Sequence, residues 1–149
     1  MTWSPAAVLT PDVGDLSEDV HRLFLDIERT TGRRGAAGQC TPPLDVLETD
    51  EVVEVIVDLP GVTRDSVRVL LKGNVIVVAG EKETDAREAQ DVRAFHLVER
   101  VYGRFARAIR VLAAFDGARG RAILANGELR ISLPKIHDRR GQPRIVPIG

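Results

Sequence analysis

The strongest constraint on the fold lies between residues 44 and 134, where short segments rich in β-branched residues alternate with turn-forming residues. The segment 51–59 (EVVEVIVDL) is followed by Pro60 and Gly61, and the alternating segment 66–72 ends at Gly73 and Asn74. Val and Ile favour strands, and a Gly-Asn pair favours a tight hairpin turn. We therefore predict an all-β fold, an antiparallel β-sandwich of the immunoglobulin-like kind.

The same pattern continues towards the C-terminus. Residues 75–79 form another expected strand, 105–112 the next, and 119–124 with 128–133 a last hairpin across 125–127 (ANG). The stretch from Glu81 to Arg93 is highly charged and has almost no apolar anchor, so it is expected to form a long exposed loop.

The first forty residues contain one helix candidate, at about 16–31. Its apolar residues recur every three or four positions, which places them on one face: Leu16, Val20, Leu23, Phe24 and Ile27. Asp15 with Glu18 three residues later reads as a capping box, and a flexible Gly-rich linker follows up to Gly38. One helix cannot bury its own stripe, so the stripe must dock on the domain, on another copy or on a partner.

The C-terminal residues are polar except for a small apolar group at the end. Residues 136–144 are largely polar, and Ile145, Val146, Pro147 and Ile148 then follow. Proline favours an extended backbone and leaves fewer conformations to lose on docking. This segment is predicted to be a strand-like peptide that docks in a groove. The chain thus divides into an N-terminal arm (1–41), a sandwich domain (42–135) and a C-terminal tail (136–149).

Composition excludes several classes of function. The 21 basic and 22 acidic residues nearly cancel, which argues against a nucleic-acid or membrane-surface binder. The N-terminus lacks the features of a secretory signal, and no apolar run is long enough to span a membrane, so a soluble cytoplasmic protein is expected. The single cysteine, Cys40, forms no intrachain disulfide and reads as a bystander thiol in a linker.

No recognised enzyme motif is present. The sequence contains no phosphate-binding loop, no dinucleotide-binding glycine pattern and no Gly-x-Ser-x-Gly elbow. His21, His96 and His137 fall in three separate zones, unlike the ligands of a metal site. Paired carboxylates such as Asp45 and Glu48 are interpreted as solvated outer-face residues. We therefore expect no catalytic activity, no metal and no cofactor.

Six segments together resemble the alpha-crystallin domain of the small heat-shock proteins, in their bacterial or plant-like form. They occur in the family's order and spacing: Pro43–Thr49 (PLDVLET), Val57–Val62 (VDLPGV), Gly73–Lys82 (GNVIVVAGEK), Phe95–Arg107 (FHLVERVYGRFAR), Ala122–Leu129 (AILANGEL) and Val146–Ile148 (VPI). Two positions depart from the family pattern, since Glu128 stands where valine is usual and Val146 where the tail motif has its first isoleucine.

The resemblance implies an ATP-independent holdase. Such proteins bind unfolding clients, keep them soluble and leave their refolding to ATP-dependent chaperones. The expected partners are therefore further copies of this chain, unfolding client proteins and, indirectly, those chaperones.

The resemblance also implies a strand-swapped dimer. A short strand near Ala94–Val98, including Phe95, His96 and Leu97, is expected to pair with about Leu44, Val46 and Leu47 of the other copy, with the charged stretch as the arm that reaches across. An ordinary mobile loop is the alternative. Arg107 is expected to form an ion pair with a carboxylate at or near this interface, because an unpaired buried Arg would be costly.

The tail is implied to plug a groove on a neighbouring dimer. Val146 and Ile148 are expected to insert between the strands 66–72 and 119–124. Val67, Val69 and Leu71 share one face by period-two alternation, and Ala122 with Leu124 would form the opposite wall. The sequence leaves open which face lines the groove and which the core.

Client binding is expected at the helix stripe, Leu16, Val20, Leu23, Phe24 and Ile27, together with Trp3, Val8 and Leu9. Packing between copies in the oligomer is the equally weighted alternative. Two other classes remain open, namely a co-chaperone-like interaction module and a structural shell protein. The first would lack the tail motif and the swapped loop, and the second would not exchange subunits.

Overall fold

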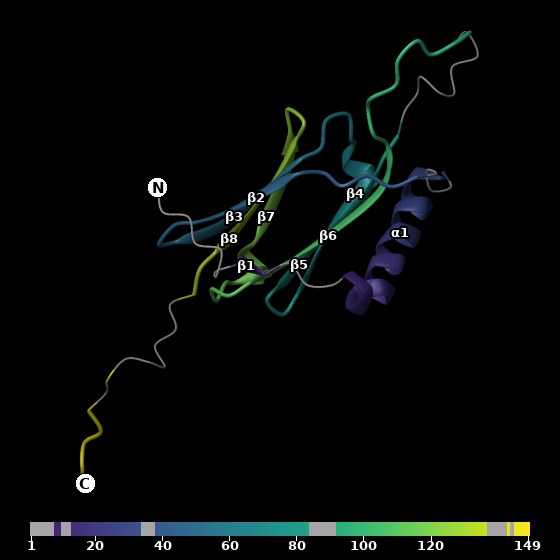
Figure 1. The fold of residues 1–149 in the computed structure, drawn as a ribbon. Coiled ribbons are helices and arrows are strands. Elements are labelled where there is room, and N and C mark those ends of the chain that lie inside the picture. The colour runs from purple at the N-terminus through teal and green to yellow at the C-terminus, as the bar shows by residue number, and fades with distance from the viewer. Residues whose placement is uncertain (1–7, 10–12, 34–37, 84–91, 137–142, 144) are drawn as a thin grey trace.

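Two antiparallel sheets pack face to face in a computed structural model of the chain (Figure 1), which describes residues 8–9, 13–33, 38–83, 92–136, 143 and 145–149. One sheet has the order β1 (Val8–Leu9), β6 (Gly103–Val111), β5 (Val75–Lys82) and β4 (Val67–Lys72). The other has the order β2 (Leu44–Glu48), β3 (Val52–Asp58), β8 (Glu128–Pro134) and β7 (Arg121–Ala125). The predicted all-β sandwich is confirmed.

The core forms because β3 and β8 bury alternate residues. Along β3 the odd-numbered residues Val53, Val55 and Val57 are buried, and they pair in register with Leu133, Ile131 and Leu129 of β8. Ile76 and Val78 of β5 with Phe105, Ile109 and Val111 of β6 complete this cluster from the opposite sheet. A period of two puts every second side chain on the inner face of a sheet, which explains the pattern.

The last hairpin has the turn that its sequence predicts. Asn126 and Gly127 connect the paired residues Ala125 and Glu128, and both adopt positive φ, at 54° and 75°. A two-residue turn with both central residues in the left-handed region matches the twist of the flanking strands. The hairpin fixes the register of β7 on β8, and thereby the position of the outermost strand of this sheet.

Strand β5 differs from the prediction because both of its faces are covered. Residues 75–81 are all buried, since one face packs on the opposite sheet and the other lies beneath α1 (Ser17–Thr31). The strand continues to Lys82, so the assignment of Glu81 to an exposed charged loop is wrong. The side chain of Glu81 is only 1% exposed. The remainder of that predicted loop at 84–91 lies outside the described residues.

The helix is confirmed, but its predicted capping box is wrong. A 3-10 turn, η2 (Val13–Leu16), leads into α1, and the N-cap residue is Leu16, with no side-chain capping hydrogen bond. The tight turn moves Asp15 away from the cap position, and the helix ends at Gly32, which has φ 69°. Sequence analysis also missed β1, whose two residues pair with β6.

Two further 3-10 turns precede β4 and β7, which are edge strands of the two sheets. The turn η3 (Arg64–Ser66) leads into β4, and η5 (Gly117–Arg119) precedes β7. The last expected hairpin therefore starts at Arg121 instead of Arg119. Asp116 caps η5 by accepting a hydrogen bond from the backbone N–H of Ala118 (3.1 Å).

Candidate protein-binding surfaces

A groove opens between β4 and β7, the edge strands of the two sheets. It has a volume of about 520 Å³ and is lined by Arg64, Val67, Arg68, Val69, Ala122, Ile123, Leu124 and Leu129. These residues include four of the five predicted from the sequence for the tail-binding groove. The fifth, Leu71, lies one pleat further along β4, where it is half-buried against the core.

The structure decides which face of each strand lines this groove. Val67, Val69 and Leu71 pack with the core between the sheets, whereas the intervening Leu70 packs with the helix cluster on the outer face. On β7, Ala122 and Leu124 pair with the buried Ile131 and Leu129 of β8, so they face inward too. Ala122 is nevertheless exposed. The sheets therefore leave an inward-facing apolar strip open to solvent at this edge.

The apolar end of the tail does not contact the sandwich of its own chain. Ile145, Val146 and Ile148 are 98%, 80% and 100% exposed. Figure 1 shows the C-terminal end away from the sheets. Exposure of three branched apolar side chains to water is unfavourable, and their burial in an apolar site would be favourable. These are the properties expected of a peptide that docks in a groove.

The segment expected to swap between copies is also exposed. Residues 92–102 form no strand, and Phe95, Leu97, Val98 and Val101 are 50–75% exposed, while His96 is exposed as well. The strand it should join, β2, is an edge strand that pairs only with β3. Leu44 and Val46 of β2 face the core, and Leu47 is 40% exposed. The free edge offers unpaired backbone groups to another chain.

Arg107 lies beside this region, and its contact in the monomer is with backbone. It donates a hydrogen bond from Nη1 to the carbonyl oxygen of Pro42 (2.7 Å), two residues before β2. Among the described residues it forms no ion pair within 4.0 Å. The carboxylate partner at a dimer interface stays a prediction.

The helix stripe docks on its own domain, which selects one of the three possibilities left by the sequence. Leu16 and Val20 pack with Val75, Val77 and Ala108 on the outer face of the β6–β5–β4 sheet, and Ile27 is fully buried. Leu23 and Phe24 are half-buried in the same contact. Trp3 lies outside the described residues, and only the backbone pairing of Val8 and Leu9 is described.

A partly buried ion-pair network, which the sequence did not predict, holds the helix to the sheet. Arg104 of β6 contacts Glu81 of β5 through Nε (3.0 Å) and Glu28 of α1 through Nη2 (2.7 Å). Its guanidinium also lies over the Phe24 ring, 4.7 Å from the centroid. The alternation along β5 could have indicated the burial of Glu81. Residues 75, 77, 79 and 81 lie on the same face of the strand, which is the face that α1 covers.

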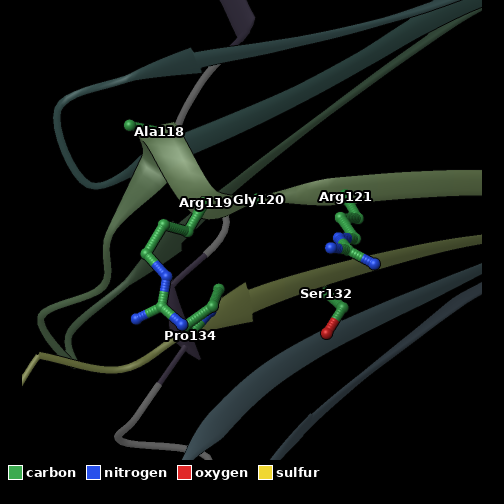
Figure 2. Close-up of a pocket in the computed structure, with 6 residues that line it drawn as sticks. All are labelled: Ala118, Arg119, Gly120, Arg121, Ser132 and Pro134. Carbon is green, nitrogen blue, oxygen red and sulfur yellow. The ribbon is translucent and has the colours of Figure 1, made fainter.

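A second hollow, of about 440 Å³, lies where η5 meets β7 and β8. Figure 2 shows its lining, in which Arg119, Arg121 and Ser132 are the polar side chains. No histidine, cysteine or carboxylate is among the six lining residues, so Ser132 has no general base there to activate it as a nucleophile. The described residues contain no group of three His, Cys, Asp or Glu side chains suited to a metal ion.

Cys40 is partly buried beside the start of β6. Its thiol donates to the carbonyl oxygen of Gly103 (3.4 Å), and burial raises the pKa of the thiol, with Lys82 opposing the shift. A neutral thiol is neither a good nucleophile nor a metal ligand. Within the described part of the chain, no helix has the length and apolarity that a membrane span needs.

Comparison with known proteins gives consistent matches to heat-shock proteins. Residues 45–149 match the model of the Hsp20/alpha crystallin family. The chain is 28% identical to heat shock protein 16 of Schizosaccharomyces pombe, a match that covers 98% of this chain and 99% of that protein. It is 35% identical to a 21.9 kDa heat shock protein of Oryza sativa subsp. japonica, covering 99% and 80%. A match to spore protein SP21 of Stigmatella aurantiaca, at 38% identity, covers 63% of this chain and 54% of that one.

Solved structures agree. Heat shock protein 16.0 from Schizosaccharomyces pombe superposes with a TM-score of 0.64 at 29% identity, covering 73% of this chain and 99% of that chain. A small heat-shock protein from Xylella fastidiosa, described as having a distinct high order structure, gives 0.63 at 26% identity, covering 75% and 99%.

Proposed function

Since this chain belongs to the Hsp20/alpha crystallin family, we propose that it is an ATP-independent holdase chaperone that binds partly unfolded proteins and prevents their aggregation. It acts in the cytoplasm, without a cofactor and without catalysing a reaction. It assembles from strand-swapped dimers into larger oligomers, and it leaves the refolding of its clients to ATP-dependent chaperones.

The groove between β4 and β7 is the observation that carries this proposal. It exposes inward-facing apolar side chains, Val69 and Ala122 among them, while the same chain exposes the apolar tail residues Val146 and Ile148. A tail whose apolar residues are exposed on its own chain is suited to the groove of a neighbouring copy. Burying two such side chains contributes about 2–3 kcal/mol each. Assembly from several weak contacts of this size favours exchange of subunits.

The free edge of β2 and the exposed segment 94–98 support the dimer. A partner strand laid on β2 would satisfy its unpaired backbone groups and cover Phe95 and Leu97, which are 50% and 75% exposed. The masking of an edge strand by another copy also removes a template for aggregation. Arg107 next to Pro42 then lies where a partner carboxylate would be expected.

Holdase activity follows physically from the same surfaces. An unfolding client exposes apolar side chains and unpaired strand edges, and these are the features that aggregate. Grooves vacated by tails would cover them, and so would the apolar side chains of the N-terminal arm (Leu16, Val20, Leu23, Phe24 and Ile27) once α1 leaves the sheet. No nucleotide is needed, because burial of apolar area supplies the binding free energy.

Light scattering of a heat-labile client tests the proposal. Heated without ATP, the client should scatter much less light in the presence of an equimolar amount of this protein than with the same mass of serum albumin. Unchanged scattering at equimolar ratio would refute the holdase. A monomeric mass under the same conditions would instead favour an interaction module that binds a dedicated partner.

A further inference from the structure

The outer face of the β6–β5–β4 sheet, beneath α1, is built as a helix-binding surface. Its floor is apolar and consists of valine, alanine and leucine side chains: Val75, Val77 and Ala79 from β5, Ala106 and Ala108 from β6, and Leu70 from β4. Small and β-branched side chains leave room for a helix to approach closely. Figure 1 shows α1 lying across these strands, on the side away from the second sheet.

Basic side chains border this floor, and each one pairs with an acidic residue of the helix. Lys72 contacts Asp19 (2.9 Å), Arg68 contacts Asp26 (2.7 Å) and Arg104 contacts Glu28 (2.7 Å). These sheet residues come from β4 and β6, on either side of the β5 floor. The surface therefore recognises a pattern, an apolar helix stripe with carboxylates along its flanks.

Two of the three basic residues, Arg104 and Arg68, also have contacts within the sandwich domain that do not involve α1. Arg104 is held by Glu81, a residue of the sheet itself, whose side chain is 1% exposed and whose Oε1 lies 3.0 Å from Arg104 Nε. Arg68 likewise donates to the backbone carbonyl oxygens of Asp65 and Val67. When α1 leaves, these guanidinium groups stay in place above the apolar floor. The site is therefore preorganised for another helix.

Part of the contact between the helix and the sheet is open to solvent. Leu23 and Phe24 are only half-buried, and Asp26 and Lys72 are 58% and 61% exposed. Exposed ion pairs contribute about 0–1 kcal/mol each. An isolated fifteen-residue helix is itself marginal in water, so α1 depends on this contact for its stability. Leu16, Val20 and Ile27 are buried, so a helix that replaces α1 must bury a comparable apolar stripe on the same floor.

We propose that this sheet face is a second client-binding surface, specific for amphipathic helices with acidic flanks, and that α1 is its built-in occupant. An exposed acidic amphipathic helix of a partly unfolded client displaces α1 and takes its place. This inference rests on the proposed holdase function and names the class of client segment for one of its surfaces. Tethering gives α1 an effective concentration in the millimolar range, which sets the threshold that a client helix must exceed.

Fluorescence anisotropy with labelled peptides tests the surface on the full-length chain. One peptide has the sequence of residues 17–31, and a second has an unrelated sequence with the same spacing of apolar and acidic positions. Val20→Ser loosens α1 without changing a residue of the sandwich, because Val20 belongs to the helix and its side chain, 8% exposed, packs on the sheet. Both peptides should bind the Val20→Ser chain at least tenfold more tightly than the unaltered chain.

Leu25→Ser is the matched control, because Leu25 lies on the same helix but is 38% exposed and faces away from the buried stripe. It should bind the peptides like the unaltered chain. A peptide whose acids at the positions of Asp19, Asp26 and Glu28 become amides should lose most of its affinity. Adding Lys72→Gln to the Val20→Ser chain should weaken binding several-fold, and Lys72 is exposed enough for that variant to fold.

Three results would overturn the inference. These are equal peptide binding to the Val20→Ser and Leu25→Ser chains, equal binding of acidic and amide peptides, and binding of the 17–31 sequence alone. The last would assign the face to α1 of a second copy. Light scattering of a client on the same samples separates the two proposals. Peptide binding without suppression of aggregation refutes the holdase function but retains the helix-binding surface. Suppression of aggregation without peptide binding refutes only the helix-binding surface.

Discussion

At the scale of single residues, Arg104 is the most connected position described. Its side chain joins Glu81 of the sheet, Glu28 of the helix and the ring of Phe24. Its backbone joins the linker, since its N–H donates to Gly38 (3.1 Å) and its carbonyl oxygen accepts from Cys40 (2.9 Å). One residue thus fixes the arm, the linker and two strands relative to one another.

The linker can pass this close to β6 only because residue 103 is glycine. Gly103 has φ +121°, and a Cβ there would lie 2.4 Å from the carbonyl carbon of Gly38. Gly103→Ala should therefore lower the free energy of unfolding by about 2–4 kcal/mol, combining backbone strain and a steric clash. Urea unfolding followed by circular dichroism measures the loss.

Gly61→Ala is the control for Gly103→Ala. Gly61 also has positive φ, at +80°, but no atom lies within 4 Å of a Cβ placed there. Gly61→Ala should lower the free energy of unfolding by the backbone strain alone, about 1–2 kcal/mol. Equal losses for the two alanine variants would show that the close approach of the linker contributes nothing.

The Cys40 thiol should be slow to react at neutral pH. Burial disfavours the charged thiolate and raises the pKa of the thiol above that of an exposed cysteine. The pH midpoint of iodoacetamide alkylation should therefore be higher for the folded chain than for the same chain in urea. Lys82→Met should raise the folded midpoint further, because the Lys82 charge opposes the shift. A folded midpoint at or below the unfolded one would contradict the burial.

The sign of this effect on stability follows by linkage. The folded state favours the neutral thiol, so the contribution of Cys40 to stability is present below the unfolded pKa, about 8.5, and is lost as pH rises above it. The effect acts only in alkaline solution, and it leaves stability near neutral pH unchanged.

At the scale of elements, we propose that the tail of one copy docks in the groove between β4 and β7 of another. The double change Val146→Ala, Ile148→Ala removes most of the apolar area of the plug, a loss of about 1–2 kcal/mol per side chain. Large oligomers should dissociate towards dimers in size-exclusion chromatography at micromolar concentration. Ile136→Ala is the control, since Ile136 is exposed outside the Val-Pro-Ile motif, and its elution should not change.

The groove side of the same contact can be changed independently. Ala122→Gln places a polar side chain on the exposed inward wall without altering the buried core, because Ala122 is exposed. It should shift the oligomer distribution in the same direction as the tail variant, and combining the two should add little. Additive effects would mean that the tail docks elsewhere.

At the scale of the whole molecule, the exposed segment 94–98 and the free edge of β2 predict how copies join. Leu97→Lys removes an apolar side chain that is 75% exposed in the monomer. It should weaken dimerisation at least tenfold, because the charge would be desolvated in the swapped pairing. Sedimentation at low micromolar concentration measures this. Val92→Lys, in an exposed residue before the segment, should leave the dimer intact, and equal weakening by both changes would argue for an ordinary loop.

Local patterns in the sequence determined much of this protein. Alternation along β3 and β8, the Asn126-Gly127 turn and the three-to-four spacing in α1 specify strand, hairpin and helix within a few residues, because neighbouring side chains set the period of burial. Four of the residues that line the groove, Val67, Val69, Ala122 and Leu124, followed from the same alternation once the family resemblance had named the strands. The sequence left open which face lines the groove, and it did not indicate that Leu71 lies outside the lining.

Only the tertiary structure showed which distant segment packs on each face of the strands. The sequence of β5 reads as apolar from residue 75 onward, yet nothing local shows that α1 lies on its outer side, or that Glu81 is buried beneath that helix and paired with a residue more than twenty positions away. The same holds for the linker at Gly103 and for the gap between β4 and β7. Alternation tells a strand which residues share a face, but the partner of that face comes from distant segments whose approach depends on the packing of the whole chain.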